Sequence, residues 1–212
     1  TMPGFALPPL RVRRHQAKDS ADVPTDGLFG IALSATKLHD VKRATALARA
    51  DVAAALVSAE PDEPWIVWCD TDYEADALAR IIPGAVEVRG SHPIERKEEA
   101  LAGFADGTAR VLVTKPSICG FGLNWQHCAR VLFVGRSFSY ESWYQAVRRC
   151  WRFGQARPVE VHLIVAEGED QIGRVIDRKA GDHTTMKAAM TGAMRRAMGR
   201  AAPLRVAYHP TH

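Results

Sequence analysis

Three side chains suited to binding an anion lie in one short run of the chain. Gln145, Arg149 and Arg152 are spaced four and then three residues apart, which on an α-helix places them on one face. A guanidinium is planar, keeps its charge at any working pH and can bind two phosphate oxygens at once. The spacing therefore predicts a helical face for a phosphate-like ligand, and we expect the adjacent Arg148 to point away from it into a surface ion pair.

A glycine turn precedes this run, in the segment Gly120-Phe-Gly122-Leu-Asn124. Glycine lets a ligand or another backbone approach closely, because it has no Cβ. Two interpretations stay open for each residue type. The glycines either admit a ligand or pack in a βα loop, and Asn124 either contacts a nucleotide or caps a helix.

Composition excludes several classes of protein. The chain has 212 residues, enough for one large or two small domains, and no apolar run long enough to span a membrane. Its four cysteines form no C-x-x-C pair and its histidines show no metal-ligand spacing, which argues against a metal site and against a disulfide framework. Scattered cysteines favour a reducing cytoplasm.

The basic residues give a net charge of +4 and cluster at 11–14, at 148–157 and in the tail from residue 174. Such clusters either bind nucleic acid or form a solvated basic surface. The tryptophans Trp125, Trp143 and Trp151 leave a similar choice, between stacking on bases and packing in the core.

Hydrophobic patterning predicts three parts along the chain. Residues 1–60 are expected to be irregular up to about residue 40 and then to form one Ala-rich helix at 41–58. Residues 61–168 alternate β-branched runs with helical ones, which predicts an α/β domain whose parallel sheet has helices on both faces. Residues 169–212 predict a helical basic tail, in which a methionine series packs rather than binds.

Individual elements of the central part follow from the same patterns. Strands are predicted at 65–69, 85–89, 110–114, 130–134 and 159–166, and helices at 73–82, 93–104 and 139–152. Ligands of such sheets bind at the carboxyl ends of the strands. Because both the glycine turn and the arginine run follow strands, we expect the whole site at that edge.

The order of these motifs resembles the second RecA-like domain of superfamily two helicases and translocases, and most closely its chromatin-remodeller-like and phage-encoded branch. The motif Q-x-x-x-R-x-x-R-x-G-Q lies at the C-terminal end of that domain. It is matched here by Gln145, Arg149, Arg152, Gly154 and Gln155. The resemblance covers residues 64–167 and implies that Arg149 and Arg152 are arginine fingers, the catalytic residues of this domain.

The resemblance also implies two sets of contacts around a Thr followed by a Gly-x-Gly-x-Asn turn. The nucleotide-binding set is Gln145, Gly120, Gly122 and Asn124. The nucleic-acid-binding set is Thr114, Lys115, Ser117 and Arg89. Lys115 and Ser117 are alternatives to Thr114, because the spacing from Thr114 to Gly120 is longer than in the remodeller pattern.

No G-x-x-x-x-G-K-[ST] loop occurs in the sequence, although a nucleotide motor needs one for phosphates and a carboxylate for magnesium. We therefore expect a C-terminal part of a larger protein, whose upstream RecA-like domain binds ATP and Mg²⁺ and which acts on nucleic acid, DNA in the first place, without sequence preference. Two alternatives remain: a stand-alone nucleic-acid-binding module without ATPase activity, and a dinucleotide-binding α/β enzyme. The second is disfavoured because no G-x-G-x-x-G follows a first strand.

Overall fold

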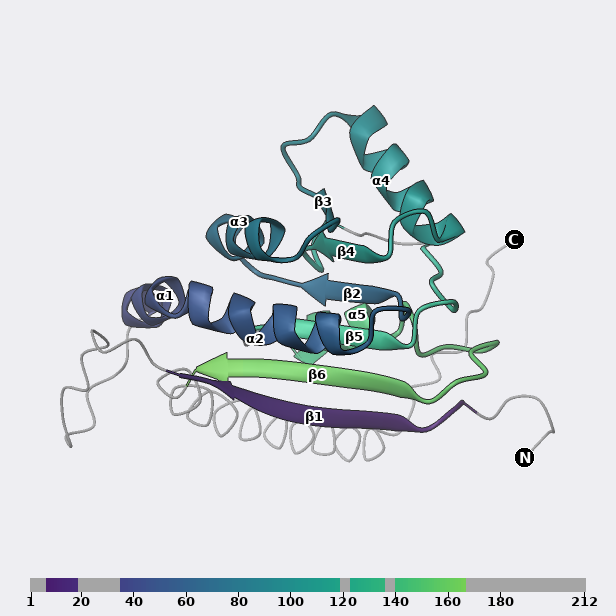
Figure 1. Cartoon of the computed structure of the whole chain (residues 1–212), viewed down its shortest axis with the longest axis horizontal. Coiled ribbons are helices and arrows are strands. Elements are labelled where there is room, and N and C mark those ends of the chain that lie inside the picture. Colours follow the sequence, from purple (N-terminus) through teal and green to yellow (C-terminus); the bar gives the residue numbers. More distant parts are fainter. Residues whose placement is uncertain (1–6, 19–34, 119–122, 136–139, 167–212) are drawn as a thin grey trace, which may run out of the picture. The chain divides into compact units, whose positions relative to one another are not determined.

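The computed structural model describes residues 7–18, 35–118, 123–135 and 140–166. In these ranges six parallel strands form one sheet with the spatial order β1-β6-β5-β2-β4-β3 (Figure 1). The strands are β1 Leu10–Ala17, β2 Trp65–Trp68, β3 Val86–Val88, β4 Val111–Thr114, β5 Arg130–Val134 and β6 Val159–Ala166. The helices are α1 Ala35–Ala44, α2 Ala46–Ala59, α3 Asp72–Ile81, α4 Ile94–Asp106 and α5 Tyr140–Val147. The expected helical tail lies outside the described residues.

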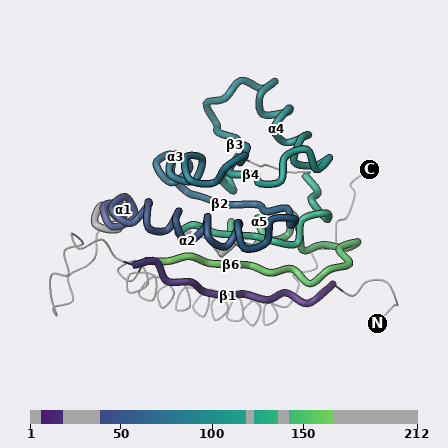
Figure 2. The backbone as a smooth tube through the Cα atoms, in the orientation of Figure 1, coloured from purple at the N-terminus to yellow at the C-terminus, as the bar shows by residue number. Residues whose placement is uncertain are grey.

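Two hydrophobic layers cover the two faces of the sheet. Alternate residues of each strand point to opposite faces, so Trp65 packs in one layer and Ile66 in the other. Helices α2 and α3 belong to the first layer, and α4 and α5 to the second. In Figure 2 α2 crosses the front of the sheet, while α5 lies behind it. This confirms the prediction of a parallel sheet with helices on both faces.

Strand β1 corrects the prediction of irregular structure before residue 40. It pairs with β6 along its whole length, from Leu10↔Val159 to Ala17↔Ala166, and α1 begins at residue 35. The strand was missed because residues 11–14 are exposed, so this edge strand has no hydrophobic alternation to detect. Polar contacts attach it instead, among them the ion pair of Arg11 with Glu160 at 3.0 Å.

The single helix predicted at 41–58 is two helices that meet at Thr45. The backbone there has φ −96° and ψ 2°, and the Thr45 hydroxyl donates to the Val41 carbonyl at 2.8 Å. The Arg49 guanidinium donates to the carbonyl of Lys42 at 2.5 Å. The side chains of Thr45 and Arg49 therefore hydrogen-bond to backbone carbonyls of α1 where the chain bends. Helix propensity alone does not predict such a bend.

A fully buried ion pair joins α2 to the start of α3. Arg49 Nη1 lies 2.6 Å from Glu74 Oε1, and both side chains have 0% exposure. The second carboxylate oxygen of Glu74 accepts hydrogen bonds from the backbone N–H groups of Asp70 at 2.9 Å and Thr71 at 3.0 Å. The pair thus satisfies the N-terminus of α3 as well as the buried guanidinium.

Gly135, directly after β5, makes room for this pair. It has φ +88°, and a Cβ at this position would overlap the Arg49 Nη1 atom and lie 3.0 Å from Glu74 Oε1. The buried pair leaves no space for a larger residue.

We predict that Gly135→Ala destabilises the domain far more than Gly107→Ala. Gly107 has nearly the same φ, +87°, but nothing lies within 4 Å of the position that a Cβ would occupy there, so its substitution carries only the backbone penalty of about 1–2 kcal/mol. Gly135→Ala also disrupts the buried pair, which adds about 3–5 kcal/mol. Urea unfolding followed by tryptophan fluorescence measures both, and equal losses in the two variants would show that the pair is not a constraint.

Candidate functional site

The arginine run does not lie on one helical face. Helix α5 ends at Val147, and the chain then makes tight turns in which Arg149 N donates to Ala146 O at 3.2 Å and Cys150 N to Val147 O at 3.1 Å. The helix predicted to reach residue 152 is therefore too long. Arg149 and Arg152 project from a turn, which we call the arginine turn (residues 148–155).

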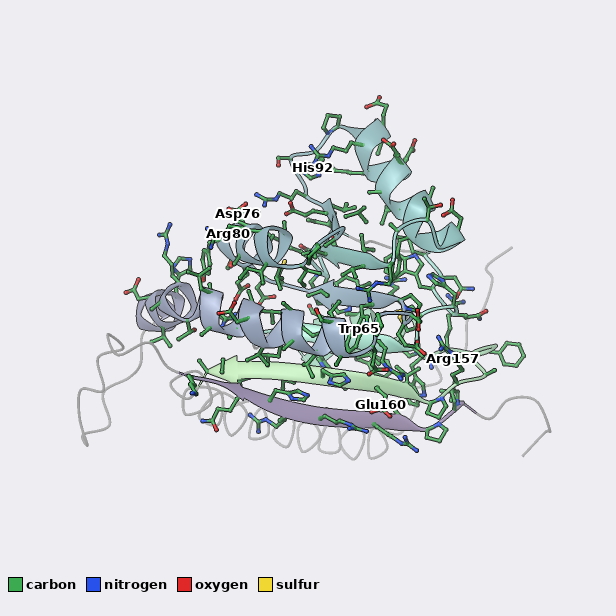
Figure 3. The ribbon with its side chains drawn as sticks, in the orientation of Figure 1. Trp65, Asp76, Arg80, His92, Arg157 and Glu160 are labelled. Carbon is green, nitrogen blue, oxygen red and sulfur yellow. The ribbon has the colours of Figure 1, made fainter. Side chains whose placement is uncertain are left out.

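The arginine turn lies at the amino edge of the sheet, just before β6 begins. Arg157 and Glu160, which follow this turn, mark that edge in Figure 3. Asn124 also lies there, because it precedes β5. The expectation that these residues lie at the carboxyl ends of the strands is thus wrong. The chain returns to the amino edge after α5, and a motif that follows one strand can equally precede the next.

Backbone and side-chain hydrogen bonds join the arginine turn to the loop that contains Asn124. Trp125 N donates to Arg149 O at 3.0 Å, and Gln126 Nε2 donates to Phe153 O. Sequence motifs separated by some twenty residues therefore form one unit. Gly120 and Gly122 lie outside the described residues, so their assignment as nucleotide contacts stays a prediction.

Gln155 holds the base of this unit. Its amide nitrogen donates to the carbonyls of Gln126, Cys128 and Cys150 at 2.9, 3.1 and 3.3 Å, and its amide oxygen accepts from Arg157 N at 3.0 Å. Gln155 is 7% exposed. The motif contained this residue, but its structural role was not foreseen, because the three carbonyls come from parts of the chain that only folding brings together.

Gly154 allows the turn to close. Its φ is +92°, and a Cβ there would lie 2.7 Å from Gln126 Nε2. Sequence reasoning missed Gln126, whose amide fills this space. Gly154 within the motif was the available signal, because a glycine can mark the close approach of another group.

Within the described residues, the guanidiniums of Arg149 and Arg152 make no hydrogen bond or ion pair. Both residues are partly exposed, and Gln145 and Asn124 are exposed. Arg148 differs, because its guanidinium lies 5.7 Å from the centre of the Trp151 ring. The expected ion pair of Arg148 is thus replaced by a cation–π contact. Two positive charges on a well-fixed turn are left available to an anion.

The tryptophans near this turn belong to the core. Trp125 is 1% exposed, while Trp143 and Trp151 are partly buried against the same layer. Trp151 Nε1 also donates to Pro8 O at 2.7 Å. These placements favour the packing interpretation over base stacking.

The nucleic-acid set lies at the opposite, carboxyl edge. Thr114 is buried, and its hydroxyl donates to Val88 O at 3.0 Å. Lys115 Nζ lies 2.8 Å from Asp72 Oδ1, and the resulting hydrogen bond lowers the pKa of Asp72. Ser117 is exposed after β4. Of these residues, Thr114 is buried and Ser117 is exposed, and the assignment of Lys115 or Ser117 as a phosphate contact stays a prediction.

Arg89 is held at the same edge by two carboxylates. Its guanidinium pairs with Glu87 and with Asp76, and these hydrogen bonds raise the pKa of Arg89. A phosphate must compete with both acidic groups for this cation. The sheet therefore separates Arg149, Arg152 and Asn124, which lie at its amino edge, from the predicted nucleic-acid set at its carboxyl edge.

Other reactive groups in the described part of the chain form no rival site. A hydrogen bond with Cys128 and burial raise the pKa of Cys150, and burial raises that of Cys69, so neither thiol ionises readily. No cluster of three His, Cys, Asp or Glu side chains there could hold a metal ion. None of the described helices is both long and apolar enough to cross a bilayer.

Comparison with known proteins supports one family. Residues 48–154 match the model of the helicase conserved C-terminal domain. No curated protein matches the sequence. Among solved structures, the crystal structure of the C-terminal part of the Fun30 ATPase domain is similar, with a TM-score of 0.54 and 17% sequence identity. The match covers 62% of this chain and 44% of that one, so this chain corresponds to less than half of it. The likeness confirms the RecA-like fold, while the narrower resemblance to the phage-encoded branch stays a prediction.

We predict that Gln155→Glu unfolds the domain more easily than the wild type. The substitution replaces the amide donor with a carboxylate that faces three carbonyl oxygens, which we expect to lower the free energy of unfolding by about 2–4 kcal/mol. The same change at exposed Gln145 serves as the control and should alter it by less than about 1 kcal/mol. Thermal and urea unfolding measure the difference, and similar stabilities of the two variants would refute this role of Gln155.

Proposed function

Because the chain belongs to the helicase conserved C-terminal domain family, we propose that it is the second motor domain of an ATP-dependent DNA helicase or translocase of the remodeller-like type. The observation that carries this proposal is the pair of guanidiniums on the arginine turn. Arg149 and Arg152 are partly exposed and make no internal ion pair among the described residues, while the turn itself is held by Gln155 and Gln126. Fixed, uncompensated arginines suit an anionic ligand that the domain receives from outside.

In this proposal ATP lies between the present domain and an upstream RecA-like domain. The upstream domain binds most of the nucleotide together with Mg²⁺, and Arg149 and Arg152 contact the γ-phosphate. Negative charge develops there in the transition state, and an arginine finger stabilises it by about 10³–10⁵-fold in rate. Gln145, three residues before the arginine turn, and Asn124, whose neighbour Trp125 is hydrogen-bonded to Arg149, are exposed and complete the nucleotide contacts with Gly120 and Gly122.

Nucleic acid binds at the other edge of the sheet. Lys115, Ser117 and Arg89 contact backbone phosphates, and such contacts carry no sequence information. The cations there are paired with Asp72, Glu87 and Asp76, so binding exchanges one anion for another and the grip is weak. A weak grip at one edge and a nucleotide contact at the other fit a motor that binds and releases its strand as ATP is hydrolysed.

We predict that Arg149→Ala and Arg152→Ala each abolish DNA-stimulated ATP hydrolysis by the full-length protein, with kcat reduced by about 10³-fold or more, while ATP binding is retained. Arg148→Ala is the matched control, since its guanidinium packs on Trp151, and it should retain activity within a few-fold. Steady-state hydrolysis and nucleotide-binding titrations measure the two effects. Wild-type turnover in both finger variants would mean that these arginines are structural.

The isolated chain is predicted to hydrolyse no ATP, because it lacks a phosphate-cradling loop. Its DNA binding should be independent of sequence and should fall steeply between about 50 and 200 mM salt. Anisotropy titrations with labelled oligonucleotides test this. Magnesium-dependent turnover by the isolated chain would contradict the proposal. Absence of DNA-stimulated ATPase in the full-length protein would favour the alternative of a binding module without ATPase activity.

A further inference from the structure

A surface hollow lies between the first two helices and α3, away from the arginine turn. It has a volume of about 210 Å³, which is several times the roughly 30 Å³ that a water molecule occupies in the liquid. Its lining comes from Arg43, Ala46 and Leu47 on one side and Tyr73, Asp76, Ala77 and Arg80 on the other. Arg43 lies at the end of α1 and Ala46 and Leu47 at the start of α2, while Tyr73, Asp76, Ala77 and Arg80 have the spacing of one face of α3.

The hollow carries positive charge that the described part of the chain does not neutralise. Arg43 and Arg80 are exposed, and neither forms an ion pair there. Asp76 is the acidic residue of the lining, but its carboxylate is already paired with Arg89. The hollow therefore offers two guanidiniums to an external anion.

One of these guanidiniums is already held in place. The Arg43 guanidinium carbon lies 5.6 Å from the centre of the Tyr73 ring, and this cation–π contact holds the exposed side chain at the hollow. Because the ring is covered by the guanidinium, a base is not expected to stack on it. The geometry suits a phosphate group, which accepts hydrogen bonds from a guanidinium fork.

The position of the hollow identifies the source of that phosphate. Asp76, which lines the hollow, forms an ion pair with Arg89. Asp72 immediately precedes the lining residue Tyr73 in α3 and forms an ion pair with Lys115. Figure 3 labels Asp76 and Arg80 on this helix. The hollow thus continues from the residues proposed above to grip nucleic acid.

We propose that the hollow between Arg43 and Arg80 binds a backbone phosphate of the nucleic acid held at the carboxyl edge. This inference rests on the proposed function, because it extends that grip along α3. Nucleic acid is favoured over an acidic protein because the hollow adjoins two cations already assigned to a phosphate backbone.

Salt-dependent DNA binding by the 212-residue chain tests the proposal. The variants are Arg43→Gln and Arg80→Gln. Arg11→Gln is the control: it also removes one positive charge, but at the amino end of β1. Glu160 then keeps its ion pair with Arg13. The slope of log K against log salt should fall in each single variant, and by about one when both arginines are replaced together, because one phosphate contact contributes about 0.9 to the slope. At about 0.1 M salt this corresponds to a roughly five- to tenfold loss of affinity for a short labelled DNA. Arg11→Gln should keep the wild-type slope.

A Lys115→Gln variant separates the two proposals. If Lys115→Gln lowers the slope while Arg43→Gln and Arg80→Gln do not, the hollow is not a phosphate site although the grip stands. Loss of poly-glutamate binding in the hollow variants, with DNA binding unchanged, would assign the hollow to an acidic protein and overturn the proposal. Wild-type chain that shows no salt-dependent DNA binding would overturn both.

Discussion

The buried ion pair of Arg49 and Glu74 is the constraint on which the rest of the fold depends. Both side chains are fully excluded from water, and removal of one partner from such a pair costs about 3–5 kcal/mol, because a buried charge is left uncompensated. The guanidinium also holds the Lys42 carbonyl where α1 and α2 meet, and the carboxylate holds the N-terminus of α3. Gly135 has no side chain because this pair occupies the space beside it. One interaction thereby fixes three elements around the end of β5.

The central strands explain how the two edges of the sheet stay in fixed relation. All residues of β2 and β4 are buried, and a close-packed interior moves as a rigid body rather than bending under small forces. In the proposed function, contact with ATP at the amino edge can therefore move the whole domain, including Lys115 and Arg89 at the carboxyl edge. A shift of a single loop is not required.

Sequence patterns located the buried strands well and the exposed segments poorly. The ranges 130–134 and 159–166 match β5 and β6 residue for residue, because both are rich in Val, Leu and Ile, as is typical of strands covered on both faces. Strand β1 was missed, since an edge strand with exposed arginines carries no such run. Helix α5 was predicted to end at residue 152 but ends at Val147. Helix propensity does not include the hydrogen bond from Trp125 N to Arg149 O, which depends on a distant loop.

The α/β class, the order of the motifs and the residue types suited to bind phosphate could be predicted from the sequence, because they follow from local periodicity and side-chain chemistry. Tertiary structure alone decided where those residues lie. Connections in a parallel sheet return to the opposite edge, so Arg149 and Arg152 are separated from Lys115 and Arg89 by the length of the strands. The tertiary structure also decided which cations are available. Asp76 and Asp72 of α3 pair with Arg89 and Lys115, while the arginine turn meets no carboxylate in the described part of the chain. Charge pairing depends on contacts between distant segments, and local sequence does not encode those contacts.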